Sequence, residues 1–542
     1  MKKYYVTLLI FVIVEINSHK CGKKRLIPGI IDEIDKRRLQ PEKENENDTE
    51  NHERDDKHME EVDEFKKLVI DYDYSEFDKS IENISDSTVN IIKQLLDDIG
   101  QKYGALLSSK TINTSAKYDS LMDLINSRCK LNLTSLNYET YYNLTKSNHI
   151  IIFPYFVEFR EEDQDILVDG EYCIITRDLN IKGGVLRINK NISFEKKNSE
   201  IYFKRKLFHV MTHILIFEPT LLKGLKLVKN NAIISDGVKQ TAKVHFNCFS
   251  FTVDKNFGIP LDEDGTHWDP RYMLSDYMMP IEYYDYYDIV ISDMTLALFD
   301  DSGLYNVDYL YGHNFNFGKN KSCTFFQKDC LQNNQTNFEE FCTTPDEDKC
   351  SPSRTSKGKC NAVVINNTIF NSRYEELSKK MQYCPISDHA EKNDSNYYFS
   401  TSCKYGDKNN QSFGEKYGDN SFCFISSLSP SDSNDTKEKA VCYEVQCDSA
   451  KKEIIVSING INITCPTNGG NITNLTEFNG NIICPNYNEI CLDNNNDTCN
   501  DMFDCINEKF QRNYTFDDND FGCFLYYNYL YFFSIFLIYI IL

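Results

Sequence analysis

The chain has 542 residues, of which 41% are hydrophobic and 13% aromatic, so it holds enough apolar material for about two to four folded domains. Its formal net charge of −23 repels phosphate backbones at ordinary salt. The composition therefore excludes an unfolded chain and argues against nucleic acid as a partner.

The N-terminal segment has the layout of an exported protein. Residues 1–18 resemble a secretory signal peptide, with a lysine pair, an apolar core from Tyr4 to Val14 and small or polar residues near Ser18. The stretch from Pro41 to Lys66 is rich in charge and nearly free of aliphatic residues, which predicts an acidic low-complexity linker. We assign residues 19–128, including this linker, to a pro-segment.

Two further features indicate an oxidising compartment. The chain has 20 cysteines without repeated Cys-x-x-Cys pairs, which favours disulfides over a zinc-ribbon array. Acceptor sequences for N-glycosylation begin at Asn132, Asn143, Asn191, Asn462 and Asn513. Both features predict a secreted or cell-surface glycoprotein.

A catalytic-type α+β core is predicted from residue 129. Apolar, strand-like runs occupy residues 150–159, 171–176 and 183–189. A helical pattern follows from Ile201 to Phe217, and Pro219 ends it. This N-terminal part, 129–217, carries His209 and His213, which lie four residues apart on one helix face and can reach a single zinc ion. The spacing alone is weak evidence for a metal site.

The next part, residues 218–322, contains a third histidine in a distinctive context. His267 is followed by Trp268 and, eleven residues after the histidine, by Met278. A distant third histidine with a methionine turn is the arrangement that a three-histidine zinc site requires. Met279 is the fallback for the turn methionine.

The C-terminal part, residues 323–510, is rich in cysteine and is predicted to be mainly β. Residues 453–465 read as a hairpin that turns at Asn459 and Gly460. The oxygens of Asp493 to Asp497 could bind calcium, but a solvated turn is the preferred interpretation because the expected glycine is absent. Residues 511–542 form a stalk and an apolar tail, which predicts either a glycolipid-anchor signal or a retained membrane helix.

These motifs together resemble the leishmanolysin family of surface zinc metalloendopeptidases. The similar segments begin with His209-x-x-x-His213, Val238 to Cys248, and His267-Trp268 with Met278. They continue through residues 293–305 and 318–325 and through the cysteine motifs at Cys384, Cys423, Cys442, Cys447 and Cys465. The resemblance runs from about Cys129 to Cys505. It implies a metzincin-like zinc-peptidase catalytic domain followed by a disulfide-rich, mainly β C-terminal domain.

The resemblance also implies roles for individual residues. His209, His213 and His267 would bind Zn²⁺, Met278 would form the floor of the site, and polypeptides would be the substrates or ligands. The family's pro-segment carries a cysteine in a His-x-Cys context that can close the zinc site, and His19-Lys20-Cys21 occupies that place. Cys21 could equally be half of a disulfide.

Two departures from the family pattern affect the mechanism. Val210 stands where the family has the general-base glutamate, and valine has no group that can accept a proton. Glu218 lies about 12 Å farther along a helical axis, too far to substitute. Ile216 replaces a glycine, so either the turn differs or the helix continues to Phe217. The latter change could misplace the third ligand.

The sequence therefore predicts a surface or secreted leishmanolysin homologue that binds zinc, is impaired in peptide hydrolysis, and has a role in adhesion or binding. The alternative hypothesis is an active zinc endopeptidase that uses an unusual base.

Overall fold

The computed structural model describes residues 65–491, with breaks at 111–117, 135–141, 144–147, 161–165, 197–198, 281–288, 313–314, 366–367, 372–378, 380, 389–400, 407–411, 432–436, 474 and 477. The described residues all belong to one compact unit, Glu44–Glu508. The predicted signal peptide, Cys21, the Asp493 to Asp497 loop and the apolar tail lie outside the described residues. None of the helices described is both long enough and apolar enough to span a membrane.

A four-stranded sheet carries the first half of the fold, in the order β2-β4-β6-β5. Its strands are β2 (Val69–Tyr72), β4 (His149–Val157), β5 (Val168–Ile175) and β6 (Ile181–Asn189). The continuous apolar sequence of β4 suits a central strand that is buried on both faces. Strand β5 runs antiparallel to β6 and forms one edge. The three strands predicted from the sequence are β4, β5 and β6.

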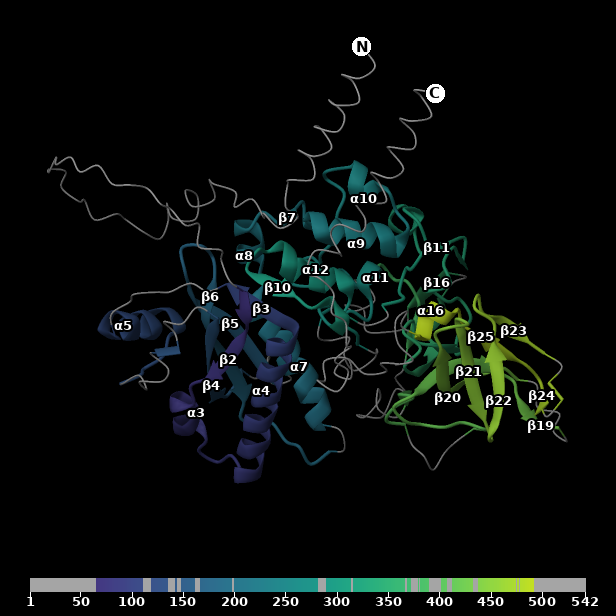
Figure 1. Ribbon diagram of the computed structural model, residues 1–542, viewed down its shortest axis with the longest axis horizontal. Coiled ribbons are helices and arrows are strands. Elements are labelled where there is room, and N and C mark those ends of the chain that lie inside the picture. Colours follow the sequence, from purple (N-terminus) through teal and green to yellow (C-terminus); the bar gives the residue numbers. More distant parts are fainter. Residues whose placement is uncertain are drawn as a thin grey trace, which may run out of the picture. The chain divides into compact units, whose positions relative to one another are not determined.

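Two long helices pack against this sheet (Figure 1). Helix α4 (Asp86–Leu106) begins at Ser85, whose hydroxyl accepts a hydrogen bond from Thr88 N. Helix α7 (Ser199–Leu215) corresponds to the helix predicted at 201–217. The hydroxyl of Tyr103 in α4 lies 2.7 Å from Phe208 O and 2.6 Å from Thr212 Oγ1, both in α7.

The N-terminal limit of this core differs from the boundary that we assigned at residue 129. Strand β2 pairs in parallel with β4, and α4 contributes Ile92, Leu96 and Ile99 to the same hydrophobic core. The shorter elements β1 (Phe65–Lys67), α3 (Ser75–Ser80), β3 (Leu107–Lys110) and α5 (Tyr118–Cys129) also lie before the boundary. Residues 65–110 are thus part of the fold that holds the histidines. The cleavage point of a pro-segment stays a prediction.

Short elements complete the first region. They are α8 (Pro219–Gly224), β7 (Val228–Lys229), β8 (Ala232–Ile233), α9 (Asp236–Phe246), α10 (Ser250–Val253), β9 (Ile259–Pro260), α11 (Pro270–Met273), α12 (Asp293–Asp301), β10 (Tyr305–Val307), a 3-10 helix (Tyr309–Tyr311) and α13 (Thr324–Gln327). One hydrophobic core joins them to the sheet and continues past Cys323 to Phe338, Phe341 and Ile386. The predicted division at residue 323 therefore does not coincide with the limit of this core.

The C-terminal region is built from antiparallel strands. Short strands come first: β11 (Leu331–Gln332), β12 (Gln335–Thr336), β13 (Asp348–Cys350), β14 (Lys357–Cys360), β15 (Ala362–Ile365), β16 (Thr368–Asn371) and β17 (Ser387–Asp388). A six-stranded sheet follows, in the order β22-β21-β20-β18-β25-β23. The remaining elements are β18 (Ser421–Ser426), β19 (Ser429–Pro430), β20 (Lys439–Asp448), β21 (Glu453–Ile458), β22 (Ile461–Cys465), β23 (Gly470–Ile472), β24 (Phe478–Asn479), β25 (Ile482–Cys484) and α16 (Tyr487–Ile490).

The predicted hairpin at Asn459 and Gly460 is confirmed. Ile458 of β21 pairs with Ile461 of β22, so the turn has two residues. Both turn residues have positive φ, 48° and 81°, as a type I′ turn requires. The expectation of a disulfide-rich, mainly β region is also confirmed, because six of the eight disulfides described join cysteines between Cys330 and Cys491.

Candidate metal centre

The last two turns of α7 supply the first two histidines of the candidate site. His209 and His213 lie one helical turn apart, and their ring centroids are 4.6 Å apart. The surrounding helix residues Phe208, Met211 and Leu215 are fully buried, so the position of this helix is set by core packing. The helix is therefore a rigid support for the two imidazoles.

The third histidine comes from the loop between β9 and α11 and completes a three-nitrogen cluster. His209 Nε2 lies 2.9 Å from His213 Nε2 and 3.2 Å from His267 Nε2. All three Nε2 atoms lie within 4.8 Å of one another. Two ligands of a tetrahedral zinc ion with Zn–N bonds of 2.0–2.1 Å are about 3.3 Å apart, close to these separations.

The Nδ1 atom of each ring contacts an oxygen that can only accept. Nδ1 of His209 donates to Tyr277 O at 2.8 Å, and Nδ1 of His213 donates to Phe217 O at 2.7 Å. Nδ1 of His267 donates to the Asp262 carboxylate at 3.0 Å. In the neutral rings every Nε2 therefore carries a lone pair and no proton. Three converging lone pairs cannot hydrogen-bond to one another, so this donor set fits a metal ion.

The electrostatic setting favours the neutral, metal-binding form of His209 and His213. Burial, with His213 and His267 close by, holds the pKa of His209 well below its ordinary value. Burial and His267 likewise lower the pKa of His213 to about 4. Burial raises the pKa of Asp262, but hydrogen bonds from His267 and the attraction to that ring outweigh it, so the pKa lies below its usual range. Asp262 therefore remains a carboxylate that orients His267.

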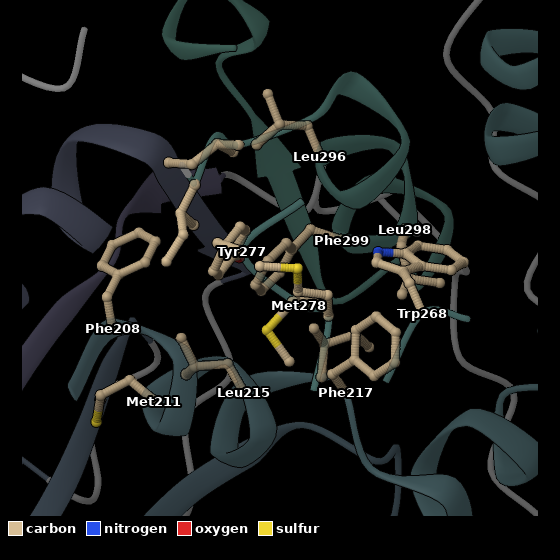
Figure 2. Packing of buried hydrophobic residues seen from close by; sticks show 14 of the residues in the cluster. Phe208, Met211, Leu215, Phe217, Trp268, Tyr277, Met278, Leu296, Leu298 and Phe299 are labelled. Carbon is tan, nitrogen blue, oxygen red and sulfur yellow. The ribbon is translucent and has the colours of Figure 1, made fainter. Parts of the chain in front are cut away.

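The segment around Met278 ties the histidines together through its backbone. Tyr277 O accepts the hydrogen bond from His209, and Met278 O accepts one from Trp268 N at 3.0 Å. Trp268 follows the third histidine, so a single turn fixes both parts of the site. Figure 2 shows Met278 between Tyr277 and Trp268 in the buried core. Met279 is also fully buried. That Met278 forms the floor of a zinc site stays a prediction.

A buried carboxylate that the sequence reasoning missed organises this turn. Asp276 Oδ1 accepts from Met278 N at 2.7 Å, and Oδ2 accepts from Thr295 Oγ1 at 2.8 Å. The indole nitrogen of Trp268 in turn donates to Thr295 Oγ1 at 2.8 Å. Burial raises the pKa of Asp276 to about 6. The sequence offered a signal for each of these two carboxylates. Asp276 lies two residues before Met278, and Asp262 lies five residues before His267.

Ile216, where the family pattern has a glycine, lies in the turn that follows α7, and the three histidines still converge. Helix α7 ends at Leu215, and Ile216 and Phe217 both donate from their backbone N–H to Thr212 O. Ile216 is fully buried and does not adopt a positive φ. Of the two expected alternatives, continuation of the helix to Phe217 is not seen, because α7 ends at Leu215. The concern that Ile216 misplaces the third ligand is wrong, because Phe217 O orients His213 and the three rings converge.

Val210 packs against the edge strand. Its side chain is 5% exposed, and a Cβ atom added to Gly170 of β5 would lie only 2.8 Å from Val210 Cγ1. An apolar side chain thus fills the position where the family pattern places an acid. Valine contributes packing here and offers no proton acceptor.

The carboxylates around the site are engaged in other contacts. Glu218 caps α8, because its Oε2 atom accepts from Leu221 N at 2.8 Å. It also accepts a hydrogen bond from Tyr172 at 3.3 Å. On β5, Asp169 and Glu171 both form ion pairs of 2.7 Å with Arg187. These contacts agree with the expectation that Glu218 does not replace the missing base.

Comparison with known proteins agrees with this geometry. The family model for leishmanolysin matches residues 146–498, which is more than half of the chain. The chain belongs to the leishmanolysin family. This membership makes it a homologue of metalloendopeptidases, in agreement with the resemblance seen in its motifs.

Individual members of the family are distant relatives. The chain is 26% identical over 285 residues to a leishmanolysin homolog of Crithidia fasciculata, and the alignment covers 48% of this chain and 42% of that protein. It is 24% identical over 247 residues to leishmanolysin of Leishmania tropica, and the alignment covers 42% of this chain and 36% of that protein. It is 24% identical over 315 residues to a leishmanolysin-like peptidase of Drosophila melanogaster, and the alignment covers 48% of this chain and 44% of that protein. Each alignment spans less than half of the relative's length.

Proposed function

We propose that this protein is a secreted or cell-surface leishmanolysin homologue that binds zinc through His209, His213 and His267 and is severely impaired in peptide hydrolysis. The observation that supports it is the contrast between the three histidines and the residue at position 210. Three imidazoles converge with their Nδ1 atoms held by acceptors, while the base position is occupied by a buried valine. Such a site keeps affinity for metal and for polypeptides, which suits a role in binding or adhesion.

A zinc ion in this site would polarise a peptide carbonyl and acidify a water molecule. The chain's own residues hold the three imidazoles in the metal-binding tautomer through Tyr277 O, Phe217 O and Asp262. Proton transfer to a leaving amine needs an acid-base group beside the site, and Val210 cannot supply it. General acid-base help contributes about 10² to 10⁴ in rate, and its loss here should lie toward the upper end.

The proposal is tested with the full chain expressed in a secreting host. We expect elemental analysis to find about one zinc ion per chain. We expect a peptide library to show no chelator-sensitive cleavage. Chelator-sensitive turnover of the native chain would favour the alternative, an active peptidase with an unusual base. A chain that binds no zinc would reject the metal part of the proposal.

Restoring the acid gives a sharper test with a matched control. We expect Val210→Glu to show chelator-sensitive cleavage and Val210→Gln to show none, because glutamine has the same size and cannot accept the proton. Equal activity of the two variants would contradict the role assigned to position 210. Zinc content and melting temperature are measured on both, so that a folding defect is recognised.

A further inference from the structure

The three most exposed large hydrophobic side chains of the described residues gather at one corner of the fold. Val244 and Phe249 are each 63% exposed and Val253 is 78% exposed. Val244 lies near the end of α9, Phe249 directly precedes α10, and Val253 ends it; the two helices lie next to each other (Figure 1). We call Val244, Phe249 and Val253 the apolar corner.

The apolar corner is anchored to the core by a disulfide and by a buried phenylalanine. Cys248 is fully buried and bonds to Cys323, which fixes the chain just before Phe249. Phe251 of α10 is fully buried, and its ring lies 4.8 Å from that of Phe257 and 5.2 Å from that of Phe326. Phe249 and Val253 are four residues apart in sequence and point to solvent while Phe251 faces the core. Their exposure is thus enforced by the anchoring of the same short helix.

Lysines surround the apolar corner in a chain whose net charge is −23. Lys243 Nζ lies 5.2 Å from the centre of the Phe249 ring. Lys255 is exposed two residues after Val253, and Lys229 reaches the same loop, with Nζ 2.8 Å from Asn256 Oδ1. The acid beside Val253 is Asp254, whose carboxylate accepts from Asn256 N. These observations place three lysines and one aspartate beside the apolar corner.

Exposed aliphatic and aromatic side chains ringed by lysines match the chemistry of a membrane interface with anionic lipids. The apolar groups enter the boundary between headgroups and acyl chains, and the lysines meet the phosphates. We propose that the apolar corner is a membrane-contact surface that binds anionic lipid through Lys229, Lys243 and Lys255. The remainder of this acidic chain is repelled by such a surface, so the corner also orients the protein on it.

A single fluorescent probe can test this in the full chain. The chain has one tryptophan, Trp268, which is fully buried, so Val253→Trp adds one exposed reporter at a position that does not belong to the core. The matched control is Val364→Trp, because Val364 is also an exposed valine, at 53%, and lies in β15. A local reporter distinguishes insertion of the corner from attachment through any other segment.

We expect Val253→Trp to show a blue-shifted emission, quenched by brominated lipids, with vesicles of phosphatidylcholine and phosphatidylserine. The Val364→Trp emission should stay unshifted. Lys243→Gln and Lys255→Gln added to the Val253→Trp chain should each weaken binding to anionic vesicles about five-fold, measured as the lipid concentration that gives half-maximal quenching.

Three results would overturn the proposal. The first is an unshifted emission from Val253→Trp on chains that sediment with the vesicles, and the second is an equal shift at the control position. The third is a blue shift without vesicles, which would show that a protein, including a second copy of this chain, covers the corner.

Discussion

The region around the histidines and the C-terminal strand region are stabilised in different ways. Most of the buried apolar residues between 65 and 322 belong to one large hydrophobic core, which continues to Ile386 and to which α4, α7 and α12 contribute fully buried side chains. The strands between β18 and β25 enclose a much smaller core, and buried disulfides such as Cys447–Cys491 and Cys465–Cys484 lie within it. Packing defines the geometry of the first region, whereas covalent links supply much of the constraint in the second.

The arrangement of the three histidines does not require an acid at position 210. The Nδ1 atoms of the three histidines donate to Tyr277 O, Phe217 O and the Asp262 carboxylate, and none of these acceptors belongs to residue 210. An apolar residue at that position fits the surrounding core. The acceptors of the three rings are thus compatible with a valine at this position.

The largest expected effect breaks the packing of the first region. Phe208→Ala removes a ring that stacks on Tyr103 at 4.4 Å and should lower the free energy of unfolding by about 3–5 kcal/mol. Because Trp268 is the one tryptophan, its fluorescence reports unfolding of this region. In a urea titration followed by Trp268 fluorescence, the midpoint of unfolding should move to a markedly lower urea concentration. An unchanged midpoint would show that packing does not dominate here.

The next effect is confined to the C-terminal region. Replacing Cys465 and Cys484 together with serine opens a disulfide with a sequence separation of 19, a loop that contributes about 3 kcal/mol. Limited proteolysis should then cut the strands between β20 and β25, while the fluorescence transition of Trp268 stays in place. A parallel shift of that transition would mean that the two regions unfold as one unit.

A smaller effect concerns the orientation of the third ligand. Asp262→Asn weakens the acceptor that holds His267 Nδ1, and zinc affinity should fall about 10–100-fold. Competition with a chromogenic chelator measures the affinity. Asp178→Asn serves as the control, since Asp178 is exposed in the turn before β6. Equal affinities of the two variants would show that Asp262 does not support the site.

The smallest expected effect is a pH dependence of the first region. Burial lowers the pKa of His245 to about 4 from its ordinary 6.5, while its Nε2 donates to Phe317 O. Between these values the unfolded chain binds a proton that the folded chain does not, so the free energy of unfolding falls as the pH falls below about 6.5. Above about pH 6.5 the contribution of His245 to the free energy of unfolding is fully present. At about pH 5.5 the loss should be about 1 kcal/mol.

His245→Gln isolates this contribution. Urea titrations at about pH 7.5 and 5.5 should show a smaller difference for the variant than for the native chain. If both chains lose the same stability, the acid sensitivity arises from other groups.

Local sequence patterns predicted the elements that depend on neighbouring residues. Alternation and apolar runs located β4, β5 and β6, the 3.6-residue period located α7, and Asn459 with Gly460 located a tight hairpin. The fold itself begins before residue 129, because β2 pairs in parallel with β4 across a sequence separation of 80 residues. A parallel pairing of this kind leaves no local signal.

The sequence by itself determined the two histidines on one helix, the third histidine with its methionine, and the absence of an acid at position 210. Those are matters of residue identity and helical spacing. Only the tertiary structure decided that the three Nε2 atoms converge, that Asp262 and Tyr277 O hold the rings in the required tautomer, and that Ile216 is harmless. The contacts of His209 with Tyr277 O and His267 join residues more than 50 positions apart, and their geometry follows from the packing of a shared core.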